Sequence, residues 1–345
     1  MTTSPFRMVA SIAASAASVL LLFSTASVAQ EKITWKVQSH WPNSSSSFKD
    51  SLGTLKTKLG VCTKGQLVLD LHEAGALFPA KEIFPAVKRG IIQMGTISPA
   101  YLPETVTTAG IASGLPFAFR NVWETAYFHK RLGFEKMIRD EVGAQGVYYS
   151  TDKVYPTEMV SKIPVQSLED FRKLKIRSSG VLQRFLTGAG ASSSYLPGPE
   201  IYPALSTGVI NAVHWGAAQG ADSMGLYEAA KYHIRPALNI AGTDAFIINQ
   251  AALDKLPADV KKCVIDSLDE QFWVRTNEYL YLEQLTLAKA IKDKGVKLNQ
   301  LPPEVLAHLS TVAAKQWEDE GKKGPNAHKA LTALKSFLTE LGYLN

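Results

Sequence analysis

Leu174-Lys-Ile-Arg-Ser178 and the segments that follow it up to Trp215 indicate most clearly the fold class of this chain. Leu174–Ser178 predicts a short strand, and Val181–Gly188 and Glu200–Gly208 predict two helices. Val209-Ile-Asn-Ala-Val-His-Trp215 predicts another strand. Strands that alternate with helices favour a parallel sheet with covering helices, so this stretch predicts one α/β unit.

The same alternation occurs upstream, nearer the N-terminus. Apolar residues alternate with polar ones over Ile33–Val37, which predicts a strand. Over Phe48–Leu59 they recur at the spacing of one helix face, and Gln66–Leu71 predicts the next strand. A short helix over Ala80–Lys88 and a strand over Ile91–Ile97 follow. This part therefore predicts a second α/β unit.

Two units in a chain of 345 residues predict two lobes with a ligand cleft between them. No Pro or Gly interrupts the helical pattern between Pro257 and Gly295, so a helix of about 55 Å, at 1.5 Å per residue, should span both lobes. Crossing strands are expected near 151–155 and 241–245. The predicted boundaries are 30–153 and 243–282 for lobe I and 154–242 and 283–345 for lobe II, with the long helix at about 258–294 and two last helices over 302–321 and 327–341.

Composition excludes several classes of protein. With 46% hydrophobic and 20% charged residues, the chain is neither a polytopic membrane protein nor a disordered one. The net charge of +6 comes from scattered basic residues without dense Lys/Arg tracts, so we expect no nucleic acid partner. A modest positive field suits small anions better.

The first residues have the pattern of a secretory signal peptide. Arg7 precedes an apolar stretch, Met8–Phe23, and the small residues Ser27 and Ala29 flank Val28. We therefore predict a signal peptide over 1–29, cleavage after Ala29, and an exported, soluble mature protein. An uncleaved anchor helix is the less favoured alternative, because the strongly apolar core is shorter than the ~20 residues that span a bilayer.

The two cysteines, Cys62 and Cys263, leave their state open. An oxidising compartment permits a disulfide, but both residues lie in helical patterns, which fits two buried free thiols at least as well. Metal ligation would need more partners at closer spacing, so we predict no metal site.

Catalytic motifs are absent from the sequence. The seven histidines include no close metal-binding pair, and Gly190-Ala-Ser-Ser-Ser194 lacks the glycine pattern of a nucleophile elbow. No phosphate loop and no dinucleotide-binding glycine fingerprint occur. We therefore predict that the protein is not an enzyme and uses no cofactor. An exported enzyme acting on a small carboxylate is the competing hypothesis, with His214 and Asp244 as its only candidate constellation.

Several blocks in a fixed order resemble a known family. Leu174-Lys-Ile-Arg177, Pro199-Glu-Ile-Tyr-Pro-Ala-Leu205 and Thr207-Gly-Val-Ile-Asn211 follow one another as in the solute-binding proteins of tripartite ATP-independent periplasmic (TRAP) transporters. The resemblance covers about 31–300. Further matching blocks are Gly75–Pro79, Glu82–Val87, Gly90–Gly95 and Leu115–Phe117.

This resemblance implies a two-lobed α/β periplasmic binding protein with a central cleft. It implies a periplasmic protein that captures a small organic acid and delivers it to the small and large membrane permease subunits. A ligand-sensing receptor subunit is a further alternative. The chain is most similar to the subgroup that binds keto and hydroxy acids. Keto acids, cyclic amino-acid derivatives such as pyroglutamate, and aromatic acids all remain candidate ligands.

Arg177 is the strongest candidate for a ligand contact. An arginine at the end of a strand in a cleft offers a planar fork to a carboxylate, and Arg177 matches the family's carboxylate-binding arginine. His214 replaces the glutamate of the keto-acid subgroup, which predicts binding without a metal ion, since Na⁺ and Ca²⁺ prefer oxygen ligands. His214 either donates a hydrogen bond to the ligand or is a core histidine. Trp215 either forms an apolar wall of the pocket or packs in the core.

The other candidates carry weaker signals. Ser98 and Tyr101 follow the third strand, where a parallel sheet presents its ligand face. Capping or turn roles fit these two and the remaining candidates at least equally well, and Asp244 would orient His214 or accept an amine of the ligand. These candidates are Tyr155, Glu158, Thr243 and Asp244. Tyr202 matches a family tyrosine, but its apolar neighbours predict core packing.

The oligomeric state stays open. Some relatives of the keto-acid subgroup form dimers by exchanging a C-terminal helix, and residues 302–345 suit either such an exchange or packing on their own lobe. The protein is therefore expected to be a monomer or a helix-swapped dimer.

Overall fold

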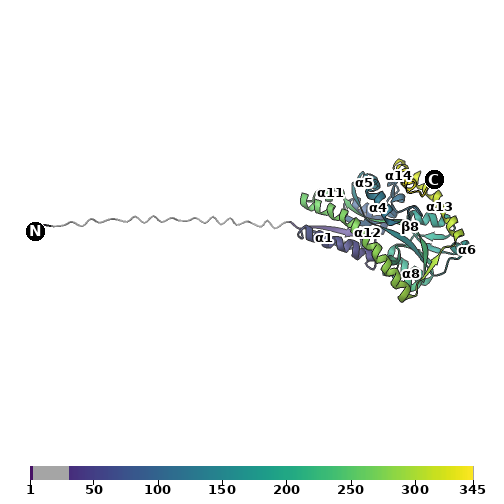
Figure 1. Cartoon of the computed structure of the whole chain (residues 1–345). Coiled ribbons are helices and arrows are strands. Elements are labelled where there is room, and N and C mark those ends of the chain that lie inside the picture. Colours follow the sequence, from purple (N-terminus) through teal and green to yellow (C-terminus); the bar gives the residue numbers. More distant parts are fainter. Residues whose placement is uncertain (3–30, 345) are drawn as a thin grey trace. The chain divides into compact units, whose positions relative to one another are not determined.

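The computed structural model describes residues 1–2 and 31–344, and one mixed sheet of nine strands organises the body of the protein (Figure 1). The strand order is β2-β1-β3-β8-β4-β7-β5-β6, and β9 pairs with β8. The strands are β1 (Ile33–Gln38), β2 (Leu67–His72), β3 (Met94–Ile97), β4 (Val147–Ser161), β5 (Lys175–Arg177), β6 (Ser192–Ser194), β7 (Ala212–His214), β8 (Tyr232–Asn249) and β9 (Lys297–Gln300).

The two long strands β4 and β8 join the two halves of this sheet. They are antiparallel to each other along their length. At one end β3 pairs with the second half of β8, and at the other end β7 pairs with the last residues of β4. β4 is one continuous strand whose pairing with β8 has register shifts, the first between Thr151 and Lys153. A side chain at Gly242 would lie 2.5 Å from Thr157 Cγ2, so the close pairing there requires glycine.

Short helices cover both halves of the sheet, as the alternation of strands and helices predicts. β1 is parallel to β2 and β3, and β5 is parallel to β6 and β7. The two-lobed α/β fold is therefore confirmed, while the lobe boundaries stay a prediction. The π-helix η1 (Phe48–Gly53) and the 3₁₀ helices η2 (Ala80–Glu82) and η3 (Pro99–Tyr101) supplement α1 (Thr54–Cys62), α2 (Ile83–Lys88), α3 (Ala109–Ala112), α4 (Val122–Lys130), α5 (Phe134–Gly143), α6 (Leu168–Arg172), α7 (Gly180–Gly188), α8 (Gly198–Thr207), α9 (Ala218–Ser223), α10 (Leu226–Ala229) and α11 (Gln250–Asp254).

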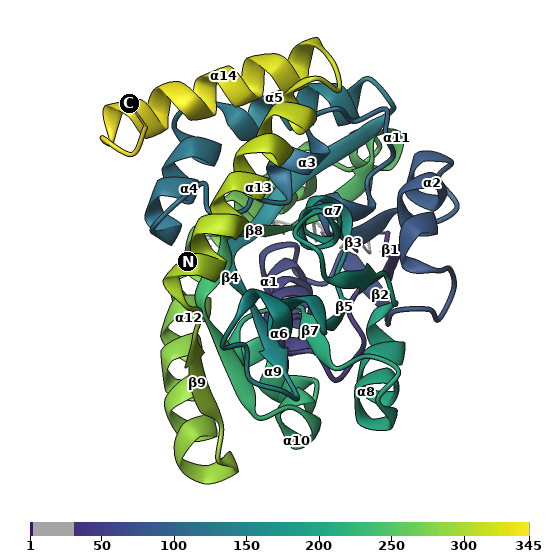
Figure 2. The same ribbon diagram turned by 90° about the vertical axis from the view of Figure 1, so that its right-hand side faces the viewer.

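The long helix is present as predicted. α12 (Ala258–Lys294) has 37 residues, begins after Pro257 and ends at Gly295, whose left-handed φ of 67° suits glycine. It packs against α1, β4, α9 and α10. Figure 2 shows it along one side of the body, with α5 and α14 at one end and α8 and α10 at the other. α12 thus connects the elements of both halves.

The last two helices differ in part from the predicted division into lobes. α13 (Pro303–Gly321) packs on α6 and α7 of predicted lobe II, whereas α14 (Pro325–Glu340) packs on α3 and α5 of predicted lobe I. Phe337 of α14 stacks on Phe128, with ring centroids 6.3 Å apart. The periodicity of a sequence defines an apolar helix face but not the surface that it covers, which explains the difference.

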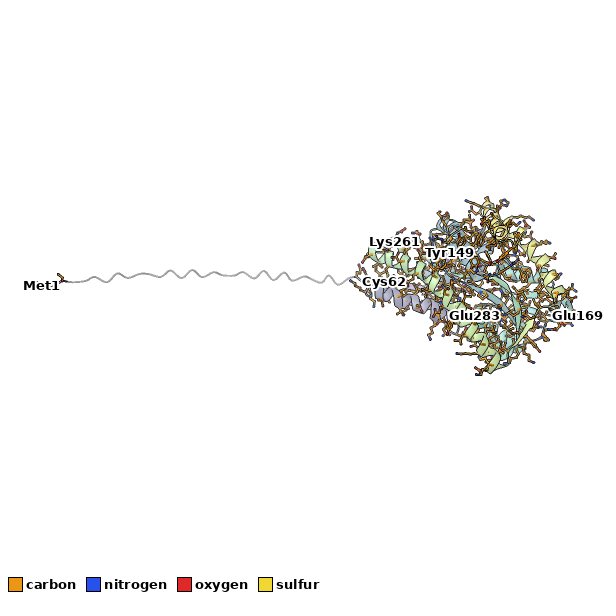
Figure 3. The ribbon with its side chains drawn as sticks, in the orientation of Figure 1. Met1, Cys62, Tyr149, Glu169, Lys261 and Glu283 are labelled. Atoms are coloured by element: carbon orange, nitrogen blue, oxygen red, sulfur yellow. A yellow bond between two sulfur atoms is a disulfide. The ribbon has the colours of Figure 1, made fainter. Side chains whose placement is uncertain are left out.

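Cys62 and Cys263 form a disulfide between α1 and α12, with Cα atoms 6.3 Å apart. Cys62 is exposed and Cys263 is partly buried, so the alternative of two buried free thiols is wrong. Figure 3 labels Cys62 at this end of α1. Residues 3–30 lie outside the described part, and with them the predicted signal sequence and its cleavage after Ala29. Within the described residues, none of the helices combines the length and the apolar character needed to cross a bilayer.

Candidate functional site

The parallel strands of both halves end at one cavity of about 70 Å³. From the first half it is lined by residues that follow β1 and β3, namely His40, Ser98 and Tyr101. From the second half it is lined by Arg177, His214 and Trp215, which end or follow β5 and β7. Since ligands bind at the carboxyl ends of parallel strands, this position marks the cavity as a binding site. Its volume is well below the ~300–1,000 Å³ of drug-sized pockets and suits a small molecule.

Arg177 is held in a fixed orientation at this cavity, with 2% of its surface exposed. Its Nε donates to the carbonyl oxygen of Leu196 at 2.9 Å, and Nη1 donates to that of His214 at 3.1 Å. Nη2 donates to the hydroxyl of Tyr101 at 3.1 Å. The Trp215 ring covers the guanidinium, with its centroid 4.7 Å from Cζ. Contacts on three sides therefore aim the guanidinium into the cavity.

The charge of Arg177 has no counter-ion among the described residues. All three of its hydrogen bonds go to uncharged oxygens. A guanidinium has five N–H groups, so two remain for a ligand. A buried cation without a partner is costly, and a carboxylate fits the planar fork. The chemistry of this wall therefore favours binding of an anion.

His214 is a neutral imidazole whose ring nitrogens both have protein partners. Nδ1 lies 3.2 Å from Ser178 Oγ, and Nε2 lies 2.8 Å from Thr157 Oγ1. Burial and then the charge of Arg177 lower the pKa of His214 to about 3. The ring lines the cavity, but its bonds go to the protein, which fits the core-histidine alternative better than a donor to the ligand. Asp244 does not orient His214, so that prediction is wrong.

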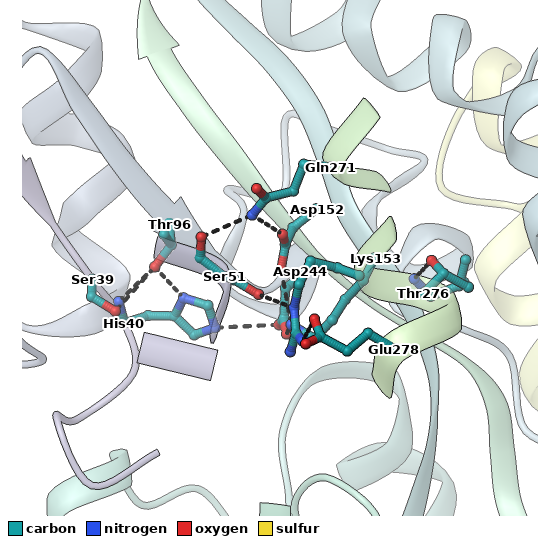
Figure 4. Close-up of polar contacts among 12 residues, drawn as sticks. Ser39, His40, Ser51, Thr96, Asp152, Lys153, Asp244, Gln271, Thr276 and Glu278 are labelled. Atoms are coloured by element: carbon teal, nitrogen blue, oxygen red, sulfur yellow. Dashed lines mark hydrogen bonds and ion pairs between the residues drawn. The ribbon is translucent and has the colours of Figure 1, made fainter. Parts of the chain in front are cut away.

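Asp244 belongs to a separate buried network on the other side of the cavity (Figure 4). Its Oδ1 lies 3.3 Å from His40 Nε2, and its Oδ2 lies 2.9 Å from Lys153 Nζ. Lys153 also lies 2.9 Å from Asp152 Oδ2. Burial alone would raise the pKa of Asp244, but the charge of Lys153 and the hydrogen bond from His40 hold it well below its ordinary value. Asp244 is therefore an ionised acceptor.

His40 and Lys153 were not among the predicted site residues. His40 follows the first predicted strand, at the edge where a parallel sheet presents ligand contacts, and this position was a usable signal. Lys153 has 0% exposed surface, and its Nζ lies 4.6 Å from the centroid of the Trp41 ring. Its signal is the adjacent pair Asp152-Lys153 inside a strand. Burial of that pair depends on the pairing of β4 with β8, which no local pattern reveals.

The structure brings most of the predicted residues to the cavity. Ser98 begins η3 and accepts a hydrogen bond from the backbone N–H of Ala100 at 3.4 Å. Tyr155 lies on β4, and burial followed by the charge of Asp244 raises the pKa of its hydroxyl well above the ordinary value. The predicted residues that line the cavity are Ser98, Tyr101, Tyr155, Arg177, His214, Trp215, Thr243 and Asp244. Their contact with a ligand stays a prediction.

The structure differs from the predictions for Glu158 and Tyr202. Side chains alternate along a strand, so Glu158 lies on the opposite face of β4 from Thr157, which lines the cavity. Its carboxylate instead contacts His233 and pairs with Arg235 Nη1 at 2.8 Å. Tyr202 lies on α8 with 40% of its surface exposed, so the prediction of core packing is wrong.

The fold and the site together define a two-lobed solute-binding protein. Crossing strands join its two α/β halves, one helix packs on both, and a small cavity holds an arginine without a counter-ion among the described residues. The family model for bacterial extracellular solute-binding protein, family 7 (DctP) matches residues 38–323, and the chain belongs to this family. It is the family of the TRAP transporter solute-binding proteins, so the resemblance seen in the sequence is confirmed.

Relatives in this family bind small acids. A monocarboxylate 2-oxoacid-binding periplasmic protein of Nostoc is 23% identical over 318 residues, which cover 90% of this chain and 85% of that protein. A TRAP solute-binding protein of Pseudoalteromonas atlantica with bound sodium and pyruvate has a TM-score of 0.81 at 22% identity, covering 90% of this chain and 95% of that one. A Bordetella pertussis extracytoplasmic solute receptor binding pyroglutamic acid has a TM-score of 0.78 at 21% identity, covering 88% and 99%. At these identities, the two structures show the shared fold.

Proposed function

We propose that this protein is the periplasmic solute-binding subunit of a TRAP transporter, which captures a small carboxylate with Arg177 and delivers it to the membrane permease subunits. The observation that carries the proposal is the buried guanidinium, whose hydrogen bonds all go to uncharged oxygens and which keeps two N–H groups for a ligand. Names of relatives that bind 2-oxoacids and pyroglutamic acid support this class of ligand.

Lobe closure is the proposed mechanism of capture. The Arg177–Tyr101 hydrogen bond joins predicted lobe II to predicted lobe I across the cavity. Elements of the two lobes also touch where α7 begins, since a side chain at Gly180 would lie 2.7 Å from Ala100 Cβ. A ligand favours this closed arrangement only through its higher affinity for it. Burial of the carboxylate beside Arg177 supplies that difference, because the attraction between charges is stronger away from water.

We propose binding rather than catalysis. Thr96, His40 and Asp244 do form a hydroxyl–imidazole–carboxylate series, with Thr96 Oγ1 2.8 Å from His40 Nδ1. However, Thr96 has 0% exposed surface and is not part of the cavity wall. A nucleophile must reach its substrate, so this series does not support hydrolysis. Its geometry fits a role in holding His40 and Asp244 in place.

The test is a calorimetric binding screen. The mature protein is unfolded, washed and refolded to remove any bound ligand, and is then titrated with a library of small carboxylates. We expect at least one acid to bind to the wild type and to lose at least about tenfold in affinity in Arg177→Ala, because a buried charge-assisted hydrogen bond is removed. Arg131→Ala, which changes an exposed arginine at the end of α4, is the matched control and should bind like the wild type. Equal binding by Arg177→Ala would contradict the proposal.

A further inference from the structure

The two sides of the cavity have opposite hydrogen-bonding character. Arg177 offers N–H donors on one side. On the other side Asp244 is ionised, lines the cavity and has 2% of its surface exposed. A carboxylate has about four lone-pair sites and no donor. His40 and Lys153 use two of these sites and the Tyr155 hydroxyl faces a third, so Asp244 keeps one site to accept from a ligand.

The polar neighbours of Asp244 donate hydrogen bonds to backbone carbonyls. The Thr243 hydroxyl donates to the carbonyl of Ala112 at 2.6 Å, and Asn239 Nδ2 donates to that of Ser113 at 3.1 Å. The Thr157 hydroxyl donates to the carbonyl of Asn239 at 3.4 Å. A hydroxyl has one hydrogen, so once it is committed only its lone pairs face the cavity. Apart from the Tyr155 hydroxyl, which faces Asp244, this wall therefore presents mainly acceptors.

The nearest cation does not reverse this character. Lys153 Nζ pairs with both Asp152 and Asp244, but Lys153 has 0% exposed surface and is not part of the cavity wall. It keeps Asp244 ionised from a position outside the cavity wall, so it is a positioning residue. A ligand oxygen placed beside Asp244 would then meet a carboxylate rather than the ammonium group of Lys153.

We infer that the ligand is a carboxylic acid that also carries an N–H or O–H donor, such as a hydroxy acid, a lactam acid or a pyrrole acid, and that Asp244 selects it over the 2-oxo acid of the same size. This inference rests on the proposed function and narrows its substrate class. The ligand carboxylate binds to Arg177, and its donor hydrogen bonds to Asp244. The oxo oxygen of a 2-oxo acid would place lone pairs against a buried carboxylate, which leaves both acceptors unpaired.

Three pairs of acids of matched shape test the inference in the ligand-stripped wild type, with a metal chelator present. Each pair differs in whether a donor is present beside the carboxylate. The pairs are lactate and pyruvate, pyroglutamate and 5-oxotetrahydrofuran-2-carboxylate, and pyrrole-2-carboxylate and furan-2-carboxylate. In every pair that binds, we expect the donor-bearing acid to bind about 10- to 100-fold more tightly, since a site built to accept a hydrogen rejects the analogue without it.

Asp244→Asn sharpens the test, because its amide has the size of the carboxylate and can donate to an oxo oxygen. We expect the preference within a pair to fall to about threefold or less, or to reverse. Asp70→Asn, at an exposed carboxylate on β2, is the matched control and should keep the wild-type preference. If Asp244→Asn does not fold because Lys153 loses a partner, the matched pairs in the wild type still decide.

The outcomes separate the inference from the function on which it rests. Equal or tighter binding of the acids without a donor, still lost in Arg177→Ala, overturns the inference and leaves the proposed function standing. If none of the six acids binds but another acid of the library without such a donor binds through Arg177, the inference is overturned and the proposed function stands. If no acid of the library binds to the wild type, both are overturned.

Discussion

Arg177, which lines the cavity, and Lys153, which pairs with the cavity-lining Asp244, are two buried cations with opposite surroundings. Lys153 lies 2.9 Å from Asp152 and 2.9 Å from Asp244, so its charge is balanced within the chain. Arg177 has 2% of its surface exposed and bonds only to uncharged oxygens. Burial is nearly the same, so it does not distinguish a structural cation from a binding one. The absence of a counter-ion among the described residues does distinguish the two, because a buried cation without a partner gains free energy when an anionic ligand pairs with it.

The largest effect is expected on the balanced side. Lys153→Met leaves Asp152 and Asp244 as two buried carboxylates without their common cation. We expect a loss of about 3–5 kcal/mol in the free energy of unfolding of the ligand-free protein, measured by denaturant titration. Wild-type stability of this variant would show that the two carboxylates do not depend on Lys153.

Removal of the disulfide separates stability from binding. In Cys62→Ser/Cys263→Ser the tie between α1 and α12 is lost, and we expect a decrease of about 2–4 kcal/mol in the free energy of unfolding. The cysteines do not line the cavity, so the affinity for the acid found in the screen should stay within about twofold. A large loss of affinity would mean that the geometry of the site depends on this disulfide. Losses of affinity in the Arg177 variants would then have to be corrected for losses of stability.

Acid should affect the two sides in different pH ranges. His214 is held neutral, with its pKa lowered from 6.5 to about 3, so the unfolded chain binds more protons between these values and stability falls as the pH decreases from about 6.5. Asp244 has a lowered pKa, so it loses stability only as the pH falls below its ordinary value of 3.8. Between pH 6 and 4.5, His214→Gln should reduce the slope of unfolding free energy against pH by about 1 kcal/mol per pH unit.

The control for this experiment is Asp244→Asn, which should leave the slope between pH 6 and 4.5 unchanged. His129, whose pKa is also lowered to about 3 by burial and by Lys130, contributes the same sign in every variant. An unchanged slope in His214→Gln would mean that this imidazole is protonated in the folded protein.

The smallest effect is expected at Tyr101. Tyr101→Phe removes the acceptor of Arg177 Nη2 but leaves the cation and its other two bonds in place. We expect the affinity for the carboxylate to fall by about fivefold, the equivalent of one hydrogen bond of about 1 kcal/mol. Calorimetry measures this, and Tyr127→Phe, at a tyrosine that is 45% exposed, is the control. A loss as large as that of Arg177→Ala would transfer the main role to Tyr101.

The sequence was sufficient for the alternating strands and helices of both α/β units, for the long helix and for the position of Arg177 at the cavity. Apolar periodicity predicted the alternating strands and helices, and the interval between Pro257 and Gly295 predicted α12 within a residue. Arg177 was found because a strand end, a planar fork and a matching family block coincide there. In each of these cases the signal is local in the chain.

Features that depend on pairing between distant segments were not predictable in the same way. Lys153 and Asp244 meet only because β4 and β8 are paired in one register, with Lys153 opposite Asp244. The position of Glu158 on the far face of β4 depends on the same register. The packing of α14 on α5, and the disulfide of Cys62 with Cys263, likewise depend on contacts between segments far apart in sequence.

Whether Arg177 captures the ligand is tested by denaturant unfolding of Arg177→Gln, with and without the acid that binds to the wild type. Without ligand, we predict a free energy of unfolding within about 1 kcal/mol of the wild type, because lost hydrogen bonds are offset by removal of an unbalanced buried charge. At 100 times the wild-type dissociation constant, the wild type should gain about 2.7 kcal/mol and the variant almost nothing. A variant that gains as much as the wild type would contradict the claim that this unpaired guanidinium captures the ligand.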